Sequence, residues 1–378
     1  MTDIHGFCDE RFEPVREAFE TNFTDGKEVG ASFALTLEGE YLVDLWAGHR
    51  DVAATIDWNE DTIVNVYSTT KTMTALTALL LADRGELDFG AKVAHYWPEF
   101  AQNGKAAIEV RHLMSHAAGL AGLETVDGPE DFYDWELVCG RLAAQAPWWE
   151  PGSASGYHAI TQGYLIGEVV RRVTGQSLGT VFRKELAEPL GADFHIGVDP
   201  RHFARIAELV PPEQPPSATD FPAESVAAKT FGNGNMIEAL ASRTEAWRRA
   251  EIPAANGHGN ARSVVRVQTL LANHGSAFGQ SLMSDAGCMR VMDEQISGTD
   301  LVLGAPMSFG LGYGLNKNGA MGLHPNTCFW GGWGGSSIVV DLDARVCFSY
   351  VMNRMESGVL GDSRGIALAA AVTESLAA

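Results

Sequence analysis

The apolar positions of this chain follow two different spacings, which divide the sequence into helical and extended segments. Apolar residues three to four positions apart are typical of amphipathic helices. This spacing, together with apolar runs that end at Gly, predicts helices over residues 12–23, 68–84, 160–173, 262–274, 284–297 and 362–378. The helix that opens at residue 68 is the most apolar of them, and Gly85 is its expected stop.

Extended segments lie at both ends of the chain. Residues 31–48 hold two alternating apolar runs around Glu38-Gly39, and this pattern predicts a β-hairpin. Residues 336–355 hold two β-branched or aromatic runs around a turn at positions 341–344, and a Gly-rich aromatic run over 309–315 precedes them. Each terminal region therefore contributes strands to the predicted structure.

The middle of the chain reads mostly as helices broken by Gly and Pro, with a five-proline loop over residues 210–223. Strands at both ends with helices between them predict an α+β fold, in which one antiparallel sheet is built from the two termini and flanked by helices. We expect an α/β domain made of residues 1–85 and 255–378. Residues 86–254 would form an inserted, mainly helical domain.

Composition narrows the class of protein. Hydrophobic residues make up 46% of the 378 positions and charged residues 20%, which is ordinary for a soluble globular protein. The 48 acidic and 27 basic residues give a net charge of −21, which disfavours nucleic acid and anionic membrane surfaces as partners. No targeting segment or membrane span is visible, and the five cysteines are odd in number and widely spaced, so a cytoplasmic location is expected. The oligomeric state stays open.

Ser68 and Lys71 form the strongest candidate for chemistry. A serine hydroxyl is a weak nucleophile until a base takes its proton, and residues three apart on a helix share one face. The spacing therefore places an amine near the hydroxyl, and a lysine buried in the apolar helix would have its pKa lowered. The helix N-terminus also offers free N–H groups to a developing oxyanion. The alternative is that Ser68 is a plain N-cap and Lys71 a solvated side chain.

Two further segments carry candidate residues. Tyr157 follows a Gly-rich loop and precedes a helix, so its phenol could project into a cleft, although a core or surface tyrosine is the more common outcome. Residues 329–337 read FWGGWGGSS, and their four glycines would let a ligand or another backbone segment approach closely. The alternative there is a bulge or a tight bend of the sheet.

Two other patterns are weaker. Gly175-Gln176-Ser177-Leu178-Gly179 matches a nucleophile motif that requires a strand before the serine, whereas a helix is predicted there, so Ser177 is expected to be a helix N-cap. His112 and His116 are four positions apart, but no Glu, Asp or Cys stands beside them at ligand spacing. We therefore expect no metal and no cofactor, and we interpret His116 as a structural histidine near the site.

The three segments together resemble the serine β-lactamase and penicillin-binding-protein superfamily, most closely class C β-lactamases and family VIII carboxylesterases. Ser68-x-x-Lys71 is similar to the first motif, Tyr157-His158-Ala159 to the second, and Trp330-Gly331-Gly332 to the third, which reads His-x-Gly or Trp-Gly-Gly in the esterases. Trp333-Gly334-Gly335 is an alternative register for the third motif. The resemblance covers residues from about 12 to 375 and implies an active site at the interface of the two expected domains.

The resemblance implies a role for each matched residue. Ser68 would be the acylated nucleophile, Lys71 and Tyr157 would share the acid and base work, and the backbone N–H groups of Ser68 and Trp333 would form the oxyanion hole. The expected substrate-binding residues are Trp330, Gly331, Gly332, His158, Trp148, Trp149 and Phe231.

Two departures from the β-lactamase pattern indicate the substrate. Trp330 stands where β-lactamases carry a lysine for the substrate carboxylate, and Ala159 stands where an asparagine is usual. Both changes favour an uncharged substrate, so we expect hydrolysis of small-molecule, short-chain carboxylic esters and at most feeble β-lactam hydrolysis. The alternatives are an acyltransferase or an amidase or peptidase on the same machinery, and a non-catalytic ligand-binding member of the fold.

Overall fold

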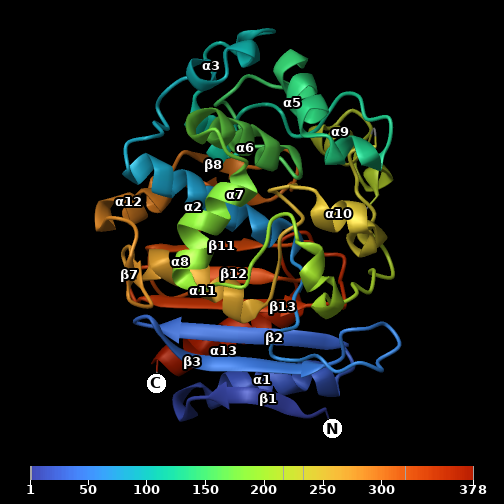
Figure 1. Ribbon diagram of the computed structural model, residues 1–378, viewed down its shortest axis with the longest axis vertical. Helices are drawn as coiled ribbons and strands as arrows, with labels where there is room; N and C mark the ends of the chain where they lie inside the picture. The colour runs from blue at the N-terminus through green and yellow to red at the C-terminus, as the bar shows by residue number, and fades with distance from the viewer. Residues whose placement is uncertain (1, 216, 233, 320, 378) are drawn as a thin grey trace.

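A single large sheet organises the molecule (Figure 1). The computed structural model describes residues 2–215, 217–232, 234–319 and 321–377. In these residues nine strands pair, all antiparallel, in the order β1-β3-β2-β13-β12-β11-β10-β9-β8. Their bounds are β1 Ile4–Cys8, β2 Gly30–Leu37, β3 Glu40–Gly48, β8 Ile296–Thr299, β9 Pro306–Phe309, β10 Gly314–Leu315, β11 Thr327–Gly331, β12 Ser337–Asp341 and β13 Val346–Met352.

The predicted origin of the sheet is confirmed, because β2 from the N-terminal region pairs directly with β13 from the C-terminal region. Two short two-stranded pairs accompany it in the described residues: β4 Val64–Asn65 pairs with β5 His258–Gly259, and β6 Ser276–Ala277 pairs with β7 Gln280–Ser281. In the described part of residues 86–254, no segment adds a strand to the large sheet. The boundaries of the two expected domains stay a prediction.

Helices cover both faces of the sheet and fill the region above it in Figure 1. Their bounds are α1 Glu13–Thr24, α2 Thr70–Asp83, α3 Val93–Tyr96, α4 Val110–Met114, α5 Trp135–Ala144, α6 Thr161–Thr174, α7 Leu178–Phe182, α8 Glu188–Leu190, α9 Val226–Phe231, α10 Glu245–Arg249, α11 Ala261–Ala272, α12 Asp285–Met289 and α13 Ser363–Ala377. Among the described residues, no helix combines the length and apolar character needed to cross a membrane.

Strand β13 shows how the two layers of helices are held. The thiol of Cys347 points to α11, where it contacts the carbonyl of Val265. Tyr350 lies on the opposite face of the strand, where its ring contacts Arg364 of α13. Every residue of β13 is buried. A strand covered on both faces reads as a continuous apolar run rather than an alternating one, which explains its sequence.

Most of the predicted elements are confirmed. The hairpin turn at Glu38 and Gly39 has positive φ at both positions, as the tight turn between twisted strands requires. The helix predicted over 284–297 is wrong in its last part, because the helical turns end at Met292 and β8 occupies 296–299. The edge of the sheet overrides a weak helical spacing there. Pro216 of the proline-rich loop and Ala378 of the last helix lie outside the described residues.

Helix α2 is buried almost along its whole length and packs against α6, α7, α11 and α12. The pairing of β4 with β5 fixes the segment that leads into the N-terminus of α2. The Val66 N–H donates to the carbonyl of Gly257, and the Gly257 N–H donates to the hydroxyl of Thr70. A helix that is apolar on all sides needs such surroundings, and they hold its first turn in one place.

A buried arginine network ties the C-terminal helix to the sheet. The guanidinium of Arg364 donates to the carboxylates of Glu28 and Asp362 and to the carbonyl of Gly334. Its side chain is 1% exposed, and the side chains of Glu28 and Asp362 are 0% and 8% exposed. Glu28 also accepts the hydroxyl of Tyr350 on β13. Residues far apart in sequence, around 28, 334 and 364, therefore meet at one cation.

Replacing Arg364 with Met should lower the free energy of unfolding by about 3–5 kcal/mol, because two buried carboxylates would lose their cation. Denaturant unfolding followed by circular dichroism measures this change. The matched control is Arg249→Met, whose partner Glu245 lies in an exposed pair, and it should cost less than about 1 kcal/mol. Equal losses in the two variants would contradict the role given to the buried network.

Candidate active site

Ser68 lies in a short 3₁₀ turn, Tyr67–Thr69, that leads directly into α2. The residue before it, Tyr67, has φ of 43°, an unusual backbone conformation for a bulky side chain. Such strain persists only where surrounding contacts hold it, and the Tyr67 ring packs on both Trp247 and Trp333. The turn presents the Ser68 side chain toward the cavity while the helix behind it stays buried.

Lys71 reaches back along α2 to the serine, as the spacing predicts. Its Nζ lies 3.1 Å from Ser68 Oγ and donates to the carbonyl oxygens of Ala159, at 2.6 Å, and Ala254, at 2.9 Å. The side chain is 1% exposed, and burial holds the pKa of the amine well below its usual range. The alternative of a solvated lysine is therefore wrong.

Tyr157 meets the same oxygen from the other side. Its hydroxyl lies 2.5 Å from Ser68 Oγ, and the Lys71 Nζ is 4.8 Å from the centre of its ring. Burial raises the pKa of the phenol, the charge of Asp300 raises it further, and the contact with Ser68 opposes both. The structure thus brings together the three side chains that the sequence names, although they come from a helix start and a distant loop.

Ser68 and Trp333, which line the same cavity, each have a backbone N–H with no acceptor among the described residues. Gly332 makes this arrangement possible, because a Cβ there would lie 2.2 Å from the carbonyl oxygen of Val66 and 3.2 Å from the Ser68 nitrogen. A glycine at this position therefore allows the end of β11 to approach the nucleophile turn closely.

A small cavity of about 70 Å³ opens beside Ser68 and Tyr157. The apolar side chains on its wall are Ile160, Phe231, Met236, Ile237, Trp333 and Val359. No charged side chain of the described residues lines it, so it offers an uncharged surface next to the hydroxyl.

Of the seven residues expected to bind substrate, one lines the cavity and six do not. Phe231 lines the cavity, whereas Trp148, Trp149, His158 and the Trp330-Gly331-Gly332 segment do not appear on its wall. Gly331 and Gly332 lie instead in backbone contacts behind the site, and the Trp149 indole donates to the carbonyl of Ala154. Trp148 packs near Gly122.

His158 is fully buried, with both ring nitrogens engaged. Its Nδ1 pairs with the carbonyl of Gly156, and its Nε2 accepts from the Leu120 N–H. Burial lowers the pKa of this imidazole to about 4. His158 was expected to bind substrate, but its buried ring instead joins the segments at Leu120 and Gly156.

Trp330 and His116 form an aromatic support for Tyr157. The His116 ring stacks on Trp330 at 5.6 Å between centroids, and both rings contact Tyr157. The Nδ1 of His116 also accepts the backbone N–H of His158. The structural reading of His116 fits these contacts, and Trp330 lies beneath the tyrosine rather than on the cavity wall.

Sequence reasoning missed several residues of the site. Ile160, Met236, Ile237 and Val359 are cavity residues with no motif around them, since an apolar wall gives the same sequence signal as an apolar core. Asp300 is the other omission, because its carboxylate accepts the backbone N–H of Tyr157 from 143 positions away. Nothing in the local sequence marks that pairing.

The sequence around Ser177 takes the structural role expected for it. Gly175 ends α6 with φ of 72°, and the Ser177 hydroxyl caps α7 by accepting the Thr180 N–H. His112 lies in the first turn of α4, where its ring accepts the Glu109 N–H. In the described ranges, no three His, Cys, Asp or Glu side chains gather in a way that could hold a metal ion.

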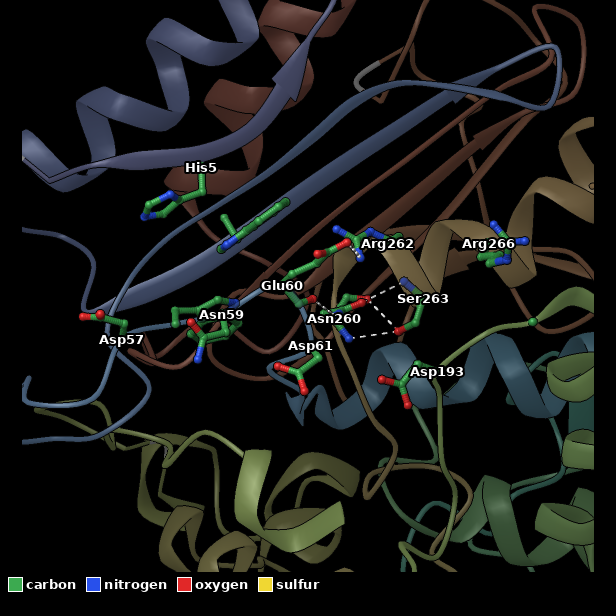
Figure 2. A pocket seen from close by; sticks show the side chains of 13 residues that line it. His5, Asp57, Asn59, Glu60, Asp61, Asp193, Asn260, Arg262, Ser263 and Arg266 are labelled. Carbon is green, nitrogen blue, oxygen red and sulfur yellow. Dashed lines mark hydrogen bonds and ion pairs between the residues drawn. The ribbon is translucent and has the colours of Figure 1, made fainter. Parts of the chain in front are cut away.

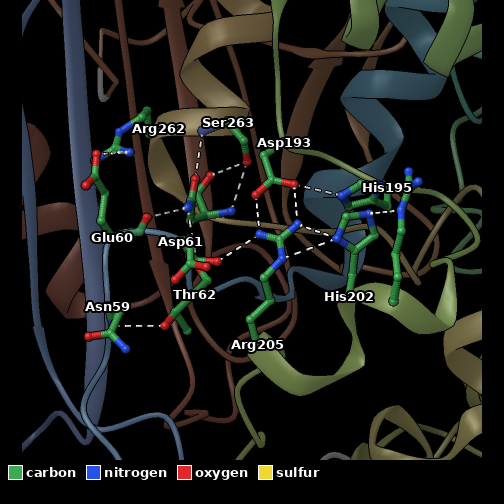
Figure 3. Close-up of polar contacts among 12 residues, drawn as sticks. Asn59, Glu60, Asp61, Thr62, Asp193, His195, His202, Arg205, Arg262 and Ser263 are labelled. Carbon is green, nitrogen blue, oxygen red and sulfur yellow. Dashed lines mark hydrogen bonds and ion pairs between the residues drawn. The ribbon is translucent and has the colours of Figure 1, made fainter.

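A second, wider cavity of about 670 Å³ lies between β3, the loop at residues 57–61 and α11 (Figure 2). None of the residues predicted for chemistry lines it. Several of its lining residues are held in ion pairs, since Arg262 pairs with Glu60 on the wall and Asp193 pairs with Arg205 and His195 outside it (Figure 3). The geometry for nucleophilic chemistry is found at Ser68 and not in this cavity.

Comparison with known proteins agrees with the fold. The family model described as Beta-lactamase matches residues 15–373. The esterase/beta-lactamase LipL of Mycobacterium tuberculosis is 36% identical over 374 residues, which cover 94% of this chain and 84% of LipL. The esterase EstB of Burkholderia gladioli is 30% identical over 206 residues, which cover 49% of this chain and 52% of EstB.

Solved structures give the same result. A crystal structure of a family VIII carboxylesterase superimposes with a TM-score of 0.92 at 41% identity, covering 99% of this chain and 100% of that one. A penicillin-binding-protein homologue from Caulobacter crescentus gives a TM-score of 0.93 at 41% identity with the same coverage. These matches confirm the expected resemblance, and the chain belongs to the beta-lactamase family.

Proposed function

We propose that this protein is a serine hydrolase that cleaves short-chain carboxylic esters through an acyl-enzyme formed on Ser68. The chain is a carboxylesterase-type hydrolase, because relatives and solved structures named as esterases match nearly its whole length. The observation that carries the finer proposal is the meeting of Lys71 Nζ and Tyr157 Oη at one oxygen, Ser68 Oγ. A cytoplasmic location stays a prediction from the odd, widely spaced cysteines.

The contacts of Lys71 favour it as the base. A neutral amine has two N–H bonds and one lone pair. The carbonyls of Ala159 and Ala254 accept the two N–H bonds, so the lone pair is left for the Ser68 hydroxyl. Because burial disfavours the ammonium form and holds the pKa of this amine well below its usual range, we assign Lys71 the role of proton acceptor.

The reaction then follows from these positions. As Ser68 Oγ bonds to the ester carbonyl carbon, its proton passes to Lys71, and the N–H groups of Ser68 and Trp333 stabilise the oxyanion. When the carbon–oxygen bond to the alcohol breaks, Tyr157 gives its proton to the leaving oxygen and recovers one from Lys71. Water attacks the acyl group along the same proton path and releases the acid.

The cavity supports an uncharged, short substrate. A volume of about 70 Å³ with an apolar wall suits a small acyl or alcohol group, and its burial supplies binding energy. A β-lactam carries a carboxylate, and desolvating that charge without a cation is costly. In the described part of this wall no Lys or Arg is available to pair with it.

Ser68→Ala should abolish turnover of p-nitrophenyl acetate by at least about 10⁴-fold, because the attacking atom is removed. A fluorophosphonate probe and mass spectrometry should place the covalent label on Ser68 in the unchanged protein. Ser177→Ala is the matched control, since that hydroxyl caps α7 and donates to Glu251 but does not line the cavity, and it should keep near-normal turnover. Labelling elsewhere, or an active Ser68→Ala protein, would refute the assignment.

The pH dependence should report the buried amine. Protonation of Lys71 removes the base, so kcat/KM should fall as the pH falls through the lowered pKa and stay level above it. The midpoint should lie well below the 10.5 of an ordinary lysine. Stopped-flow or plate assays across the range of enzyme stability measure it. A rise in kcat/KM that continues toward pH 10 would contradict an uncharged Lys71.

Substrate ranking should follow chain length and charge. We expect kcat/KM for p-nitrophenyl acetate or butyrate to exceed that for the octanoate ester and for nitrocefin by about 10²-fold or more, because neither a long chain nor a carboxylate has a place in the cavity. Ile237→Ala enlarges the cavity and should therefore lower the ratio of kcat/KM for the acetate to kcat/KM for the octanoate ester. Nitrocefin turnover comparable to ester turnover would reverse the ranking.

A further inference from the structure

A buried carboxylate holds the segment that carries Tyr157. Asp300 follows β8 and is 0% exposed. Its Oδ1 accepts three backbone N–H groups, from Tyr157 at 3.0 Å and from Val302 and Leu303 at 2.9 Å each. One oxygen therefore organises its own loop and anchors the catalytic tyrosine to it.

The charge of this carboxylate is not neutralised locally. Its Oδ2 is buried and has no hydrogen-bond partner in the described ranges, and Asp300 forms no ion pair with a described Lys, Arg or His. An asparagine could accept the same three N–H groups through its amide oxygen, so the anchor alone does not require a negative charge. The presence of an uncompensated carboxylate beside the reacting tyrosine calls for a second explanation.

The ionisable groups around Tyr157 are few. Lys71 and His116 face its ring, His158 follows it in the chain, and Asp300 lies behind its backbone. Burial lowers the pKa of both histidines, to about 4 for His158 and well below the usual value for His116, so both are uncharged near neutral pH. Asp300 is then the charge that acts on the lysine and tyrosine pair.

That pair has two arrangements with the same number of protons. In one, Lys71 is a neutral amine and Tyr157 a phenol; in the other, Lys71 is an ammonium and Tyr157 a phenolate. Since the proton count is equal, pH does not choose between them, but a local electric field does. A negative charge behind Tyr157 disfavours the phenolate.

We propose that Asp300 is a positioning residue that anchors Tyr157 through its backbone N–H and, by its negative charge, keeps the proton on the phenol, which leaves the Lys71 amine free to act as the base. This inference rests on the proposed function, because it specifies how two groups of that site divide the proton work. Its test needs no substrate, so its failure can be told apart from failure of the esterase proposal.

The test follows the ionisation of Tyr157 by ¹³C NMR of protein labelled at the tyrosine Cζ. The Tyr157→Phe protein identifies the resonance, because its spectrum lacks that one signal among the eight tyrosines. In the unchanged protein Tyr157 should remain a phenol throughout the neutral range. In Asp300→Asn the anchor is kept and the charge is lost, so Tyr157 should ionise at a pH lower by about one unit or more.

Asp44→Asn is the matched control, since it also removes a buried carboxylate. Asp44 lies on β3 and is paired with Arg262 of α11. This variant should leave the Tyr157 titration unchanged. Kinetically, Asp300→Asn should lower kcat about tenfold or more while changing KM little, because the bound ester does not touch Asp300. Asp300→Ala should also lose the anchor, and part of its lost thermal stability should return in Asp300→Asn.

A Tyr157 titration that is unchanged in Asp300→Asn, or moved to higher pH, would overturn the proposal and leave Asp300 a structural anchor. A phenolate signal in the unchanged protein at neutral pH would overturn it as well, and that measurement requires no variant. If Asp300→Asn does not fold, Asp300→Ser keeps a small hydrogen-bond acceptor without charge and should show the same downward shift.

Discussion

The whole site depends on keeping one amine out of water. Burial of α2 on all sides holds the pKa of Lys71 well below its usual range, and two carbonyl oxygens that accept from its Nζ fix the position of the amine. The layers of helices above the sheet supply that burial, and the carbonyls come from segments around residues 159 and 254 that are distant in the chain. A desolvated base therefore requires the complete tertiary structure, not a local motif.

The second requirement is a close approach of backbone segments at the serine. The β4 and β5 pair fixes the chain that enters the nucleophile turn, and β11 reaches the same turn from the large sheet at Gly332. Arg364 holds the next part of that segment by its bond to the carbonyl of Gly334. The two N–H groups that we propose as oxyanion donors thus lie on segments held from two sides, and such fixed donors need no rearrangement when substrate arrives.

The sequence predicted the features that depend on residues close together in the chain, and it missed those that depend on contacts between distant segments. The spacing of Ser68 and Lys71 is local, so helix geometry alone placed them together, and the terminal hairpins followed from alternation. Tyr157 needed the resemblance to a family, because nothing local says which cleft it enters. His158 was expected near the substrate but is buried. Its position next to Tyr157 in the sequence does not indicate which backbone segments its ring will contact. Asp300 and the cavity wall arise from packing between distant segments.

The pairing of β2 with β13 joins positions more than three hundred residues apart in sequence, and the turn at Ser68 leans on β11 from the same late part of the chain. During synthesis, the N-terminal half leaves the ribosome with its serine and lysine but without the strands that complete their surroundings. The pairing partner of β2 is complete only once residue 352 has been made. Under the function proposed above, a chain that ends before β13 would therefore lack the surroundings that the serine and lysine need for turnover.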